Sequence, residues 1–133
     1  MESKCPVAQA TEYTVRWDEY SKDFKILLKK LRKYRFTGII PILRGGLVLA
    51  THLSYLLQIP IEMPRELKRT GYYLIVDDLV DSGVTMKRYC NILMHEKLRF
   101  KTATLYRKDI TEFEPDFYVK TINKWINFPW EML

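Results

Sequence analysis

Apolar residues along this chain follow two different periodicities. Short β-branched or apolar runs, the pattern of buried strands, occupy residues 37–43, 72–76, 100–106 and 117–122. Apolar residues that recur every three or four positions, the pattern of helices, occupy residues 20–34, 47–58 and 86–94. Because strands alternate with helices, we predict an α/β fold with a mainly parallel central sheet and helices on both faces, formed as a single domain over residues 1–133.

Several local signals refine this pattern. Residues 13–17 alternate weakly and are expected to form a short edge strand, after which Asp18 stands at the position of a helix N-cap. Pro41 lacks a backbone N–H and therefore argues against a central position for the whole 37–43 strand. Helix 47–58 is apolar nearly all round, so we expect it to be buried on most sides.

Two acids and a turn follow the 72–76 strand. Asp77 and Asp78 stand where the strand is expected to end, and a Ser-Gly-Val-Thr turn then leads into the next helix. A helix N-terminus offers free N–H groups to a phosphate, Gly83 lets the backbone approach the anion, and Ser82 and Thr85 add hydroxyl donors. The carboxylates would repel a phosphate but suit a ribose diol or Mg²⁺. The pattern indicates a site for a sugar phosphate.

A second tight turn repeats this phosphate-binding logic. Arg44, Gly45 and Gly46 follow the 37–43 strand and precede helix 47–58, so a cation and a flexible backbone lie beside a helix N-terminus. Taken alone, this segment would be read as a simple strand-to-helix turn with a surface arginine.

The segment 75–85 resembles the phosphoribosyl pyrophosphate-binding signature of type I phosphoribosyltransferases. The resemblance implies that Asp77 and Asp78 hold the ribose hydroxyls and Mg²⁺, and that Asp81 accepts a proton from purine N7. These three acids are the candidate catalytic residues. The implied phosphoribosyl site comprises Asp77, Asp78, Leu79, Val80, Asp81, Ser82, Gly83, Val84 and Thr85. Residues 42–48 resemble the pyrophosphate loop of this family, which implies that Arg44 and Gly45 bind substrate and that the Leu43–Arg44 peptide is cis.

The aromatic segment 124–132 resembles the base-binding end of the xanthine-guanine phosphoribosyltransferase branch. That likeness implies that Lys108 donates to a purine 6-oxo group, that Trp125 stacks on the ring, and that the Ile126 backbone and Glu131 lie near the 2-position. The competing interpretation is that Trp125 and Trp130 merely cap the core. The implied reaction is Mg²⁺-dependent transfer of 5-phosphoribosyl from phosphoribosyl pyrophosphate to guanine, xanthine or hypoxanthine, with release of pyrophosphate.

The chain departs from this family where its lid loop normally lies. The corresponding segment, residues 59–71, is much shorter than that loop. It contains a candidate strand at 59–64, followed by a basic connection. Arg65, Lys68 and Arg69 could reach a pyrophosphate or form a solvated turn. The short segment favours an alternative, a non-catalytic regulator that senses phosphoribosyl pyrophosphate or a nucleotide. A transferase for another base, such as a pyrimidine, is the other alternative.

Composition limits the partners and the compartment. The formal charge of +6 suits polyanionic substrates as well as nucleic acid, and charge alone does not support a nucleic-acid partner. Cys5 and Cys90 lie too far apart for a zinc motif or a disulfide framework, and residues 1–6 lack the apolar core of a signal peptide. We therefore expect a cytoplasmic protein without a membrane span. We separately expect a homo-oligomer, a dimer or larger.

Few residues outside these motifs suggest chemistry. His52 and His95 lie within predicted helices and have no second ligand at metal spacing, so both are expected to be structural or solvated. One helical stripe carries sulfur-containing and apolar side chains that we expect to fill the core: Met86, Tyr89, Cys90, Leu93 and Met94.

Overall fold

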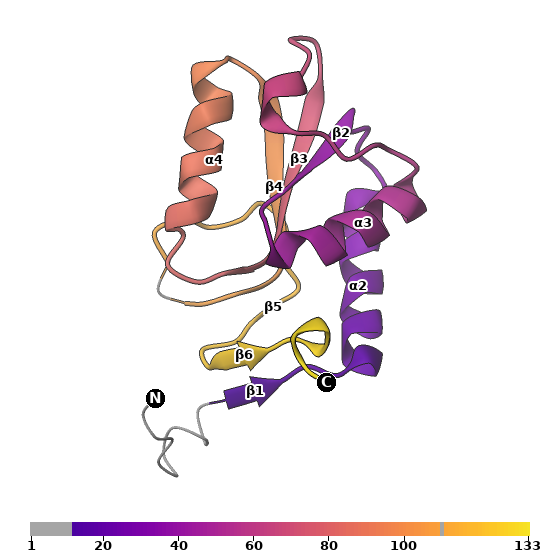
Figure 1. The fold of residues 1–133 in the computed structure, drawn as a ribbon, viewed down its shortest axis with the longest axis vertical. Helices are drawn as coiled ribbons and strands as arrows, with labels where there is room; N and C mark the ends of the chain where they lie inside the picture. The colour runs from indigo at the N-terminus through magenta and orange to yellow at the C-terminus, as the bar shows by residue number, and fades with distance from the viewer. Residues whose placement is uncertain (1–11, 110) are drawn as a thin grey trace.

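A four-stranded parallel sheet forms the centre of the computed structural model, which describes residues 12–109 and 111–133 (Figure 1). The strands lie in the order β2-β3-β4-β5, and every neighbouring pair is parallel. Their bounds are β2 Gly38–Pro41, β3 Tyr72–Val80, β4 Arg99–Arg107 and β5 Lys120–Thr121. The carboxyl ends of all four strands therefore meet at one edge of the sheet.

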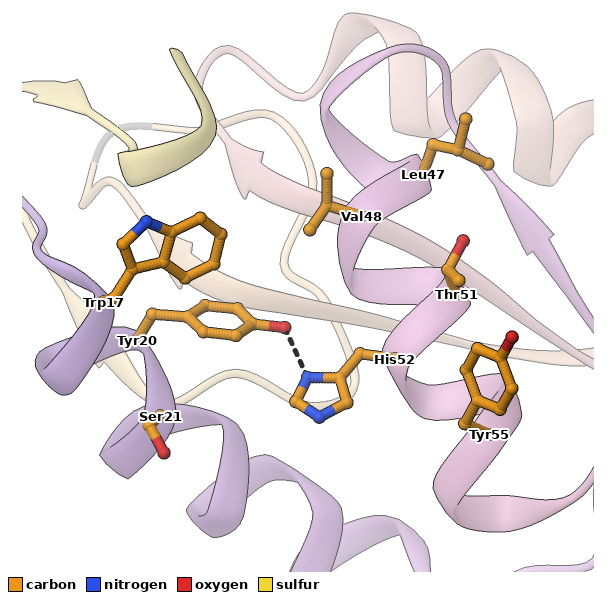
Figure 2. Close-up of a pocket in the computed structure, with 8 residues that line it drawn as sticks. All are labelled: Trp17, Tyr20, Ser21, Leu47, Val48, Thr51, His52 and Tyr55. Carbon is orange, nitrogen blue, oxygen red and sulfur yellow. Dashed lines mark hydrogen bonds between the residues drawn. The ribbon is translucent and has the colours of Figure 1, made fainter. Parts of the chain in front are cut away.

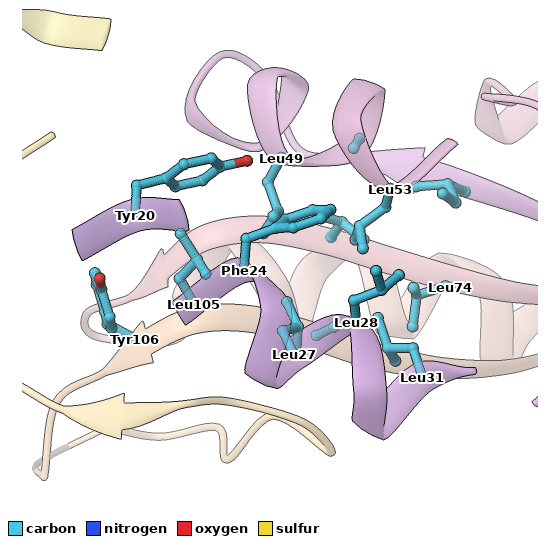
Figure 3. Packing of buried hydrophobic residues seen from close by; sticks show 14 of the residues in the cluster. Tyr20, Phe24, Leu27, Leu28, Leu31, Leu49, Leu53, Leu74, Leu105 and Tyr106 are labelled. Atoms are coloured by element: carbon cyan, nitrogen blue, oxygen red, sulfur yellow. The ribbon is translucent and has the colours of Figure 1, made fainter. Parts of the chain in front are cut away.

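Helices cover both faces of this sheet, as the sequence predicts. Helices α2 (Trp17–Leu31) and α3 (Gly45–Leu57) pack on one face, where Leu74 belongs to their apolar cluster. Helix α4 (Val84–His95) packs on the other face against Tyr73 and Ile75. Successive strand residues point to opposite faces and both faces are covered, so the first five residues of β3, 72–76, can be apolar on both sides. In Figure 3, side chains of α2 and α3 meet over the sheet, among them Leu27, Leu28, Leu31, Leu49 and Leu53.

A separate two-stranded sheet joins the two ends of the described chain. Strand β1 (Glu12–Thr14) is parallel to β6 (Trp125–Asn127), with Tyr13 opposite Ile126. The expected edge strand at 13–17 is therefore shorter and lies outside the main sheet. The assignment of Asp18 as an N-cap is wrong, because α2 begins at Trp17 and the Asp18 carboxylate accepts a hydrogen bond from the Glu19 N–H at 2.9 Å. A 3₁₀ turn, η2 (Pro129–Glu131), follows β6.

Strand boundaries follow from hydrogen bonds that the sequence does not reveal. The Ile39 N–H bonds Pro60 on one side of β2, whereas the Ile42 N–H bonds Val76 of β3. Since successive N–H groups alternate in direction, the nitrogen of Pro41 faces away from β3, which explains how this edge strand tolerates a proline. The predicted strand at 59–64 is a single bridge between Ile39 and Ile61, followed by the 3₁₀ turn η1 (Pro64–Glu66).

Two predictions about burial are wrong in part. Helix α3 buries Gly46, Leu49, Ala50 and Leu53, but Tyr55 is 78% exposed, because a helix lying on one face of a sheet buries only one side. Met94 on α4 is likewise exposed, while Met86, Cys90 and Leu93 of the same stripe are buried. Cys5 lies outside the described residues. No helix among the residues described is long and apolar enough to cross a membrane.

Candidate active site

The acid pair lies inside β3 rather than after it. The strand continues to Val80 because β4 pairs with it along nearly its whole length, with Asp77 opposite Thr104. The Asp78 N–H donates to Asp77 Oδ1 at 2.8 Å. Burial, followed by the charge of Asp78, raises the pKa of Asp77 to about 8. Burial also raises the pKa of Asp78, and the charge of Glu131 adds to that effect. Because two neighbouring carboxylates repel one another when ionised, a cation bound between this pair and a ligand would stabilise their ionised forms.

The loop after β3 forms a small hollow at the N-terminus of α4. The hollow has a volume of about 210 Å³ and is lined by residues 79–86 together with Asp77. Gly83 is the N-cap residue of α4 and has a φ of 93°, in the left-handed region that glycine adopts without strain. The Val84 N–H donates to Ser82 Oγ at 3.3 Å, and Asp81, Ser82 and Thr85 are exposed. Free N–H groups at a twelve-residue helix suit a phosphate in this hollow.

The Arg44 turn lies on the other side of the acid pair. The Leu43–Arg44 peptide is cis, as expected from the resemblance, and Arg44 is exposed. The turn is closed by a hydrogen bond from the Gly46 N–H to the Ile42 carbonyl at 2.8 Å, and α3 begins at Gly45. Gly46 is packed so closely that a Cβ there would lie 2.4 Å from the Val76 carbonyl oxygen. The turn is thereby fixed against β3.

A cleft of about 770 Å³ joins the Arg44 turn, the acid pair and the C-terminal segment. Its wall brings together six of the residues predicted from the sequence: Arg44, Gly45, Asp77, Asp78, Thr85 and Glu131. Glu131 is held by η2, where its Oε1 accepts the Phe128 N–H at 2.8 Å. A cation, a helix N-terminus and a carboxylate pair therefore face one volume, which can accommodate a ligand carrying both phosphates and hydroxyl groups.

Lys108, Trp125 and Ile126 are not in the wall of this cleft. The Lys108 N–H bonds the Val80 carbonyl at 3.1 Å, and its Nζ donates to the Lys124 carbonyl at 2.6 Å. Lys108 thus connects the end of β3 to the residue that precedes Trp125. The Trp125 side chain is 66% exposed, so the interpretation that it caps the core is wrong, whereas Ile126 is buried.

Trp130 is a cleft residue that the sequence reasoning did not assign. Its ring stacks on Phe128 with centroids 4.8 Å apart and lies edge-on to Tyr20 at 5.4 Å. It also lines the cleft beside Glu131. The signal that could have identified Trp130 is its position next to Glu131, which the sequence had assigned to the base-binding end. Trp130 therefore anchors the tail to α2 and at the same time forms part of the cleft wall.

The connection over residues 59–71 lies away from the cleft. Arg65 and Arg69 line a different hollow together with Ile92 and Glu96 near the end of α4. The Lys68 N–H donates to the Tyr73 hydroxyl at 2.7 Å, near the amino end of β3. Asp77 and Asp78, which line the cleft, are four and five residues along β3 from Tyr73, so roughly 15 Å separates them from that end of the strand. The suggestion that these basic residues reach a pyrophosphate is wrong for this conformation.

Mg²⁺ would have to be held jointly by the protein and a ligand. Within residues 12–109 and 111–133, no three His, Cys, Asp or Glu side chains converge to form a metal site. The raised pKa values of Asp77 and Asp78 show that negative charge on this pair is unfavourable, and a bound cation would compensate that charge. Mg²⁺ commonly uses one or two carboxylates and completes its coordination with substrate phosphates and water. The acid pair therefore fits Mg²⁺ bound to a phosphorylated substrate.

An uncharged groove of about 680 Å³ lies beside the cleft, between α2 and α3 (Figure 2). Val48 lines both the groove and the cleft. On the α2 side the groove is bounded by Trp17 and Tyr20, and the Tyr20 hydroxyl is hydrogen-bonded to His52 Nδ1 at 2.9 Å. The His52 ring also stacks on Phe24 with centroids 3.6 Å apart, and burial lowers its pKa. His52 is thus a structural residue, as predicted.

Known proteins resemble this chain over most of its length. Residues 64–132 match the family described as phosphoribosyl transferase domain. A relative named xanthine-guanine phosphoribosyltransferase, from Idiomarina loihiensis, is 30% identical over 146 residues, which cover 91% of this chain and 88% of the relative. A protein of the same name from Nitratidesulfovibrio vulgaris is 32% identical over 141 residues, which cover 90% of this chain and 84% of the relative. The solved structure of a purine phosphoribosyltransferase from Pyrococcus horikoshii Ot3 superposes with a TM-score of 0.84 at 30% identity, covering 92% of this chain and 95% of that one.

Proposed function

The chain belongs to the phosphoribosyl transferase family, and from this premise we propose that it is a Mg²⁺-dependent purine phosphoribosyltransferase. It transfers 5-phosphoribosyl from phosphoribosyl pyrophosphate to a 6-oxopurine, namely guanine, xanthine or hypoxanthine, and releases pyrophosphate. The observation that carries this proposal is the cleft in which Arg44, the Asp77–Asp78 pair and Glu131 face one volume. The whole chain, residues 1–133, is proposed to act as a single domain in the cytoplasm.

The phosphoribosyl half of the site is formed by two turns. The 5-phosphate fits the hollow at the N-terminus of α4, where Ser82, Gly83 and Thr85 present N–H and hydroxyl donors. The pyrophosphate fits beside Arg44 and Gly45. Asp77 and Asp78 would hold the ribose hydroxyls and Mg²⁺, and Mg²⁺ held there would supply positive charge next to the departing pyrophosphate. Residues proposed to contribute through the backbone or the wall of the hollow are Leu79, Val80 and Val84.

The chemical step develops charge at both ends of the breaking bond. The bond from C1′ to the pyrophosphate oxygen breaks while purine N9 bonds to C1′, and the proton on N7 must leave. Arg44 lies where negative charge grows on the leaving group, which stabilises the transition state more than the ground state. Asp81 is exposed at the start of the loop and is proposed to accept the N7 proton.

The purine half is proposed to lie between Lys108 and the tail. Trp125 has an exposed face on which a flat heterocycle can stack, and the adjacent Ile126 supplies backbone groups. Lys108, which has only donors, matches a 6-oxo group. Glu131, which is held by η2, is proposed to face the 2-position of the base. This arrangement distinguishes bases by whether the group at their 6-position accepts a hydrogen bond, as an oxo group does, or donates one, as an amino group does.

One assay tests this function. The protein is incubated with phosphoribosyl pyrophosphate, Mg²⁺ and each of guanine, xanthine, hypoxanthine, adenine and uracil, and pyrophosphate release is measured. We expect release with the 6-oxopurines and little with adenine or uracil. Best turnover with uracil would instead identify a pyrimidine transferase.

A non-catalytic sensor of phosphoribosyl pyrophosphate or a nucleotide is the second candidate. The observation that favours it is the position of residues 59–71, which leaves Arg65 and Arg69 at the opposite edge of the sheet from the cleft. Binding of phosphoribosyl pyrophosphate without pyrophosphate release from any of the five bases would decide in favour of this candidate.

We also propose that the protein is a homo-oligomer, a dimer or larger, associated through the outer face of α3. Leu47, Thr51 and Tyr55 are exposed and four residues apart, so they form one ridge along the helix (Figure 2). Helix α3 carries no charged residue, although 29% of the chain is charged and the net charge is +6. Copies of a basic chain can approach one another through an uncharged face without bringing like charges into direct contact.

Light scattering of matched variants tests this interface. Tyr55→Lys places a charge on the ridge and is expected to give monomers. Met94→Lys, which introduces the same charge at an exposed residue of α4, should leave the oligomer intact. A monomeric wild type, or dissociation caused by Met94→Lys alone, would show that α3 is not the contact.

A further inference from the structure

Five polar side chains form one cluster where the tail, residues 122–133, leaves the main sheet. They come from β1, α2, β4 and β5, and none of them lines the cleft. The members, called here the tail cluster, are Tyr13, Glu19, Asp23, Tyr106 and Lys120. Asp23 is 5% exposed and is the one buried charged side chain in the part of the chain that the structure describes.

Lys120 is the centre of the tail cluster. Its Nζ donates to Glu19 Oε2 at 2.7 Å and lies 3.1 Å from Asp23 Oδ2. Tyr106 donates its hydroxyl hydrogen to Asp23, and Tyr13 donates to Glu19. Burial alone would lower the pKa of Lys120, but the hydrogen bonds to Glu19 and Asp23 raise it, so the ammonium stays charged. One cation therefore holds two carboxylates of α2 against β5.

The cluster secures the tail at both of its attachments. Strand β5 pairs with β4 at only two positions, Lys120 with Tyr106 and Thr121 with Arg107, and the chain then leaves the main sheet. Tyr13 lies opposite Ile126 in the small sheet. Glu19 consequently accepts a hydrogen bond from Lys120, two positions before the tail begins, and another from Tyr13 of β1, the strand that pairs with the tail. Backbone hydrogen bonds to β4 end with the bond from the Ile122 N–H to the Arg107 carbonyl, so the direction of the chain beyond residue 122 depends on side-chain contacts and on β1.

The phosphoribosyl half of the site is held by other contacts. Within the described residues, the side-chain hydrogen bonds of the tail cluster run among its own members and do not reach Arg44 or residues 77–85. That half is fixed by the backbone pairing of β3 with β4, in which Tyr106 of the cluster lies opposite Leu79, and by the packing of α4. A disturbance at Lys120 should therefore move the purine half relative to the phosphoribosyl half.

We propose that Lys120, with Glu19 and Asp23, is a positioning residue for purine binding, an inference that rests on the proposed function. It holds the tail so that Trp125 and Ile126 stay in register with Lys108, whose Nζ bonds the Lys124 carbonyl. Lys120 does not touch the base. A displacement of about 1 Å at such a support can reduce the rate about 100-fold.

Kinetics of Lys120→Met test this role, because methionine keeps the length of the side chain and removes the charge. We expect the KM for guanine to rise about tenfold or more, while the KM for phosphoribosyl pyrophosphate changes less than about twofold. Lys120→Arg should restore most of the guanine affinity, since a guanidinium can bond both carboxylates. If Lys120→Met does not fold, Glu19→Gln keeps an uncharged acceptor for both donors and should give a smaller rise in the same KM.

Leu31→Ala is the matched control, because it destabilises the same helix at a buried site far along it from Glu19. Hydrogen exchange of the Trp125–Asn127 amides should accelerate in Lys120→Met and not in Leu31→Ala. Equal rises in both KM values, or equal acceleration in the control, would overturn the positioning role. A wild type without transferase activity would refute the proposed function, whereas the exchange experiment would still decide whether Lys120 positions the tail.

Discussion

Gly45 lies directly against Asp78, since a Cβ atom on Gly45 would come within 2.2 Å of Asp78 Oδ2. The turn proposed to hold the pyrophosphate and the acids proposed to hold the ribose are thus in contact, with no side chain between them. Any larger residue would have to displace the carboxylate or the turn. The absence of a side chain at this position sets the spacing between the two halves of the phosphoribosyl site.

Gly45→Ala is therefore expected to reduce kcat/KM by about 100-fold or more, because the added methyl group displaces Asp78 or the Arg44 turn. Steady-state pyrophosphate release measures this loss. Gly38→Ala is the matched control, as its added Cβ would mainly meet the side chain of Glu62, which can move. Comparable losses in both variants would mean that general destabilisation, and not the contact with Asp78, is responsible.

Replacing Asp77 and Asp78 together by Asn should separate stability from binding. Neutral amides remove the repulsion between two half-buried carboxylates, so the free protein should melt at the same or a higher temperature. Mg²⁺-dependent binding of phosphoribosyl pyrophosphate should weaken by roughly 100-fold or more, because two charge-assisted contacts are lost. Calorimetry and thermal melts check the two effects, with Asp18→Asn as an exposed control. Unchanged affinity would remove the acid pair from the site.

Binding should also depend on pH in a defined direction. The pKa of Asp77 is about 8 in the folded protein and has an ordinary value of 3.8, so between these values the folded state holds more protons than the unfolded state. The stability of the free protein should therefore fall as pH rises through this range. Mg²⁺ and phosphoribosyl pyrophosphate favour the ionised pair, so their affinity should rise with pH and protons should be released. Calorimetry in buffers of different ionisation enthalpy measures that release, and a pH-independent affinity would contradict it.

Lys108→Ala should weaken the preference for guanine over adenine. An unpaired buried donor costs about 1–3 kcal/mol, which corresponds to roughly tenfold discrimination or more. The loss of the bond to the Lys124 carbonyl should add a general increase in the KM for both bases. Competition assays with the two bases measure the preference. If the variant keeps its full preference for guanine, Lys108 does not read the 6-position.

The sequence predicted those features that depend on local pattern. The strand, the acids and the glycine turn at 72–85 lie close together along the chain, so their residue types were enough to indicate a phosphate site. The turn at Arg44 could be predicted for the same reason, whereas its proposed role in pyrophosphate binding came from the resemblance to the family. Both turns precede helices, and their geometry is set by the backbone within a few residues.

Features that depend on long-range pairing were not predictable in the same way. Strand β3 extends past Asp78 because β4 pairs with it there, and the exposure of Tyr55 follows from α3 covering only one face of the sheet. The tail cluster joins Glu19 to Lys120 across 101 positions of sequence, so no local pattern could reveal it. The two roles of Trp130 likewise depend on where the tail meets α2.

The placement of residues 59–71 at the amino edge of the sheet has a kinetic consequence. In enzymes that close a loop over bound reactants, the loop must reopen before products leave in each turnover. The closed loop also keeps bulk water away from the reacting bond. In this structure Arg65 and Arg69 of that segment lie beside Ile92 and Glu96 of α4 and its end, away from the cleft. For the proposed transferase we therefore expect product release that does not wait for a loop to reopen, and measurable hydrolysis of phosphoribosyl pyrophosphate by water that competes with the purine.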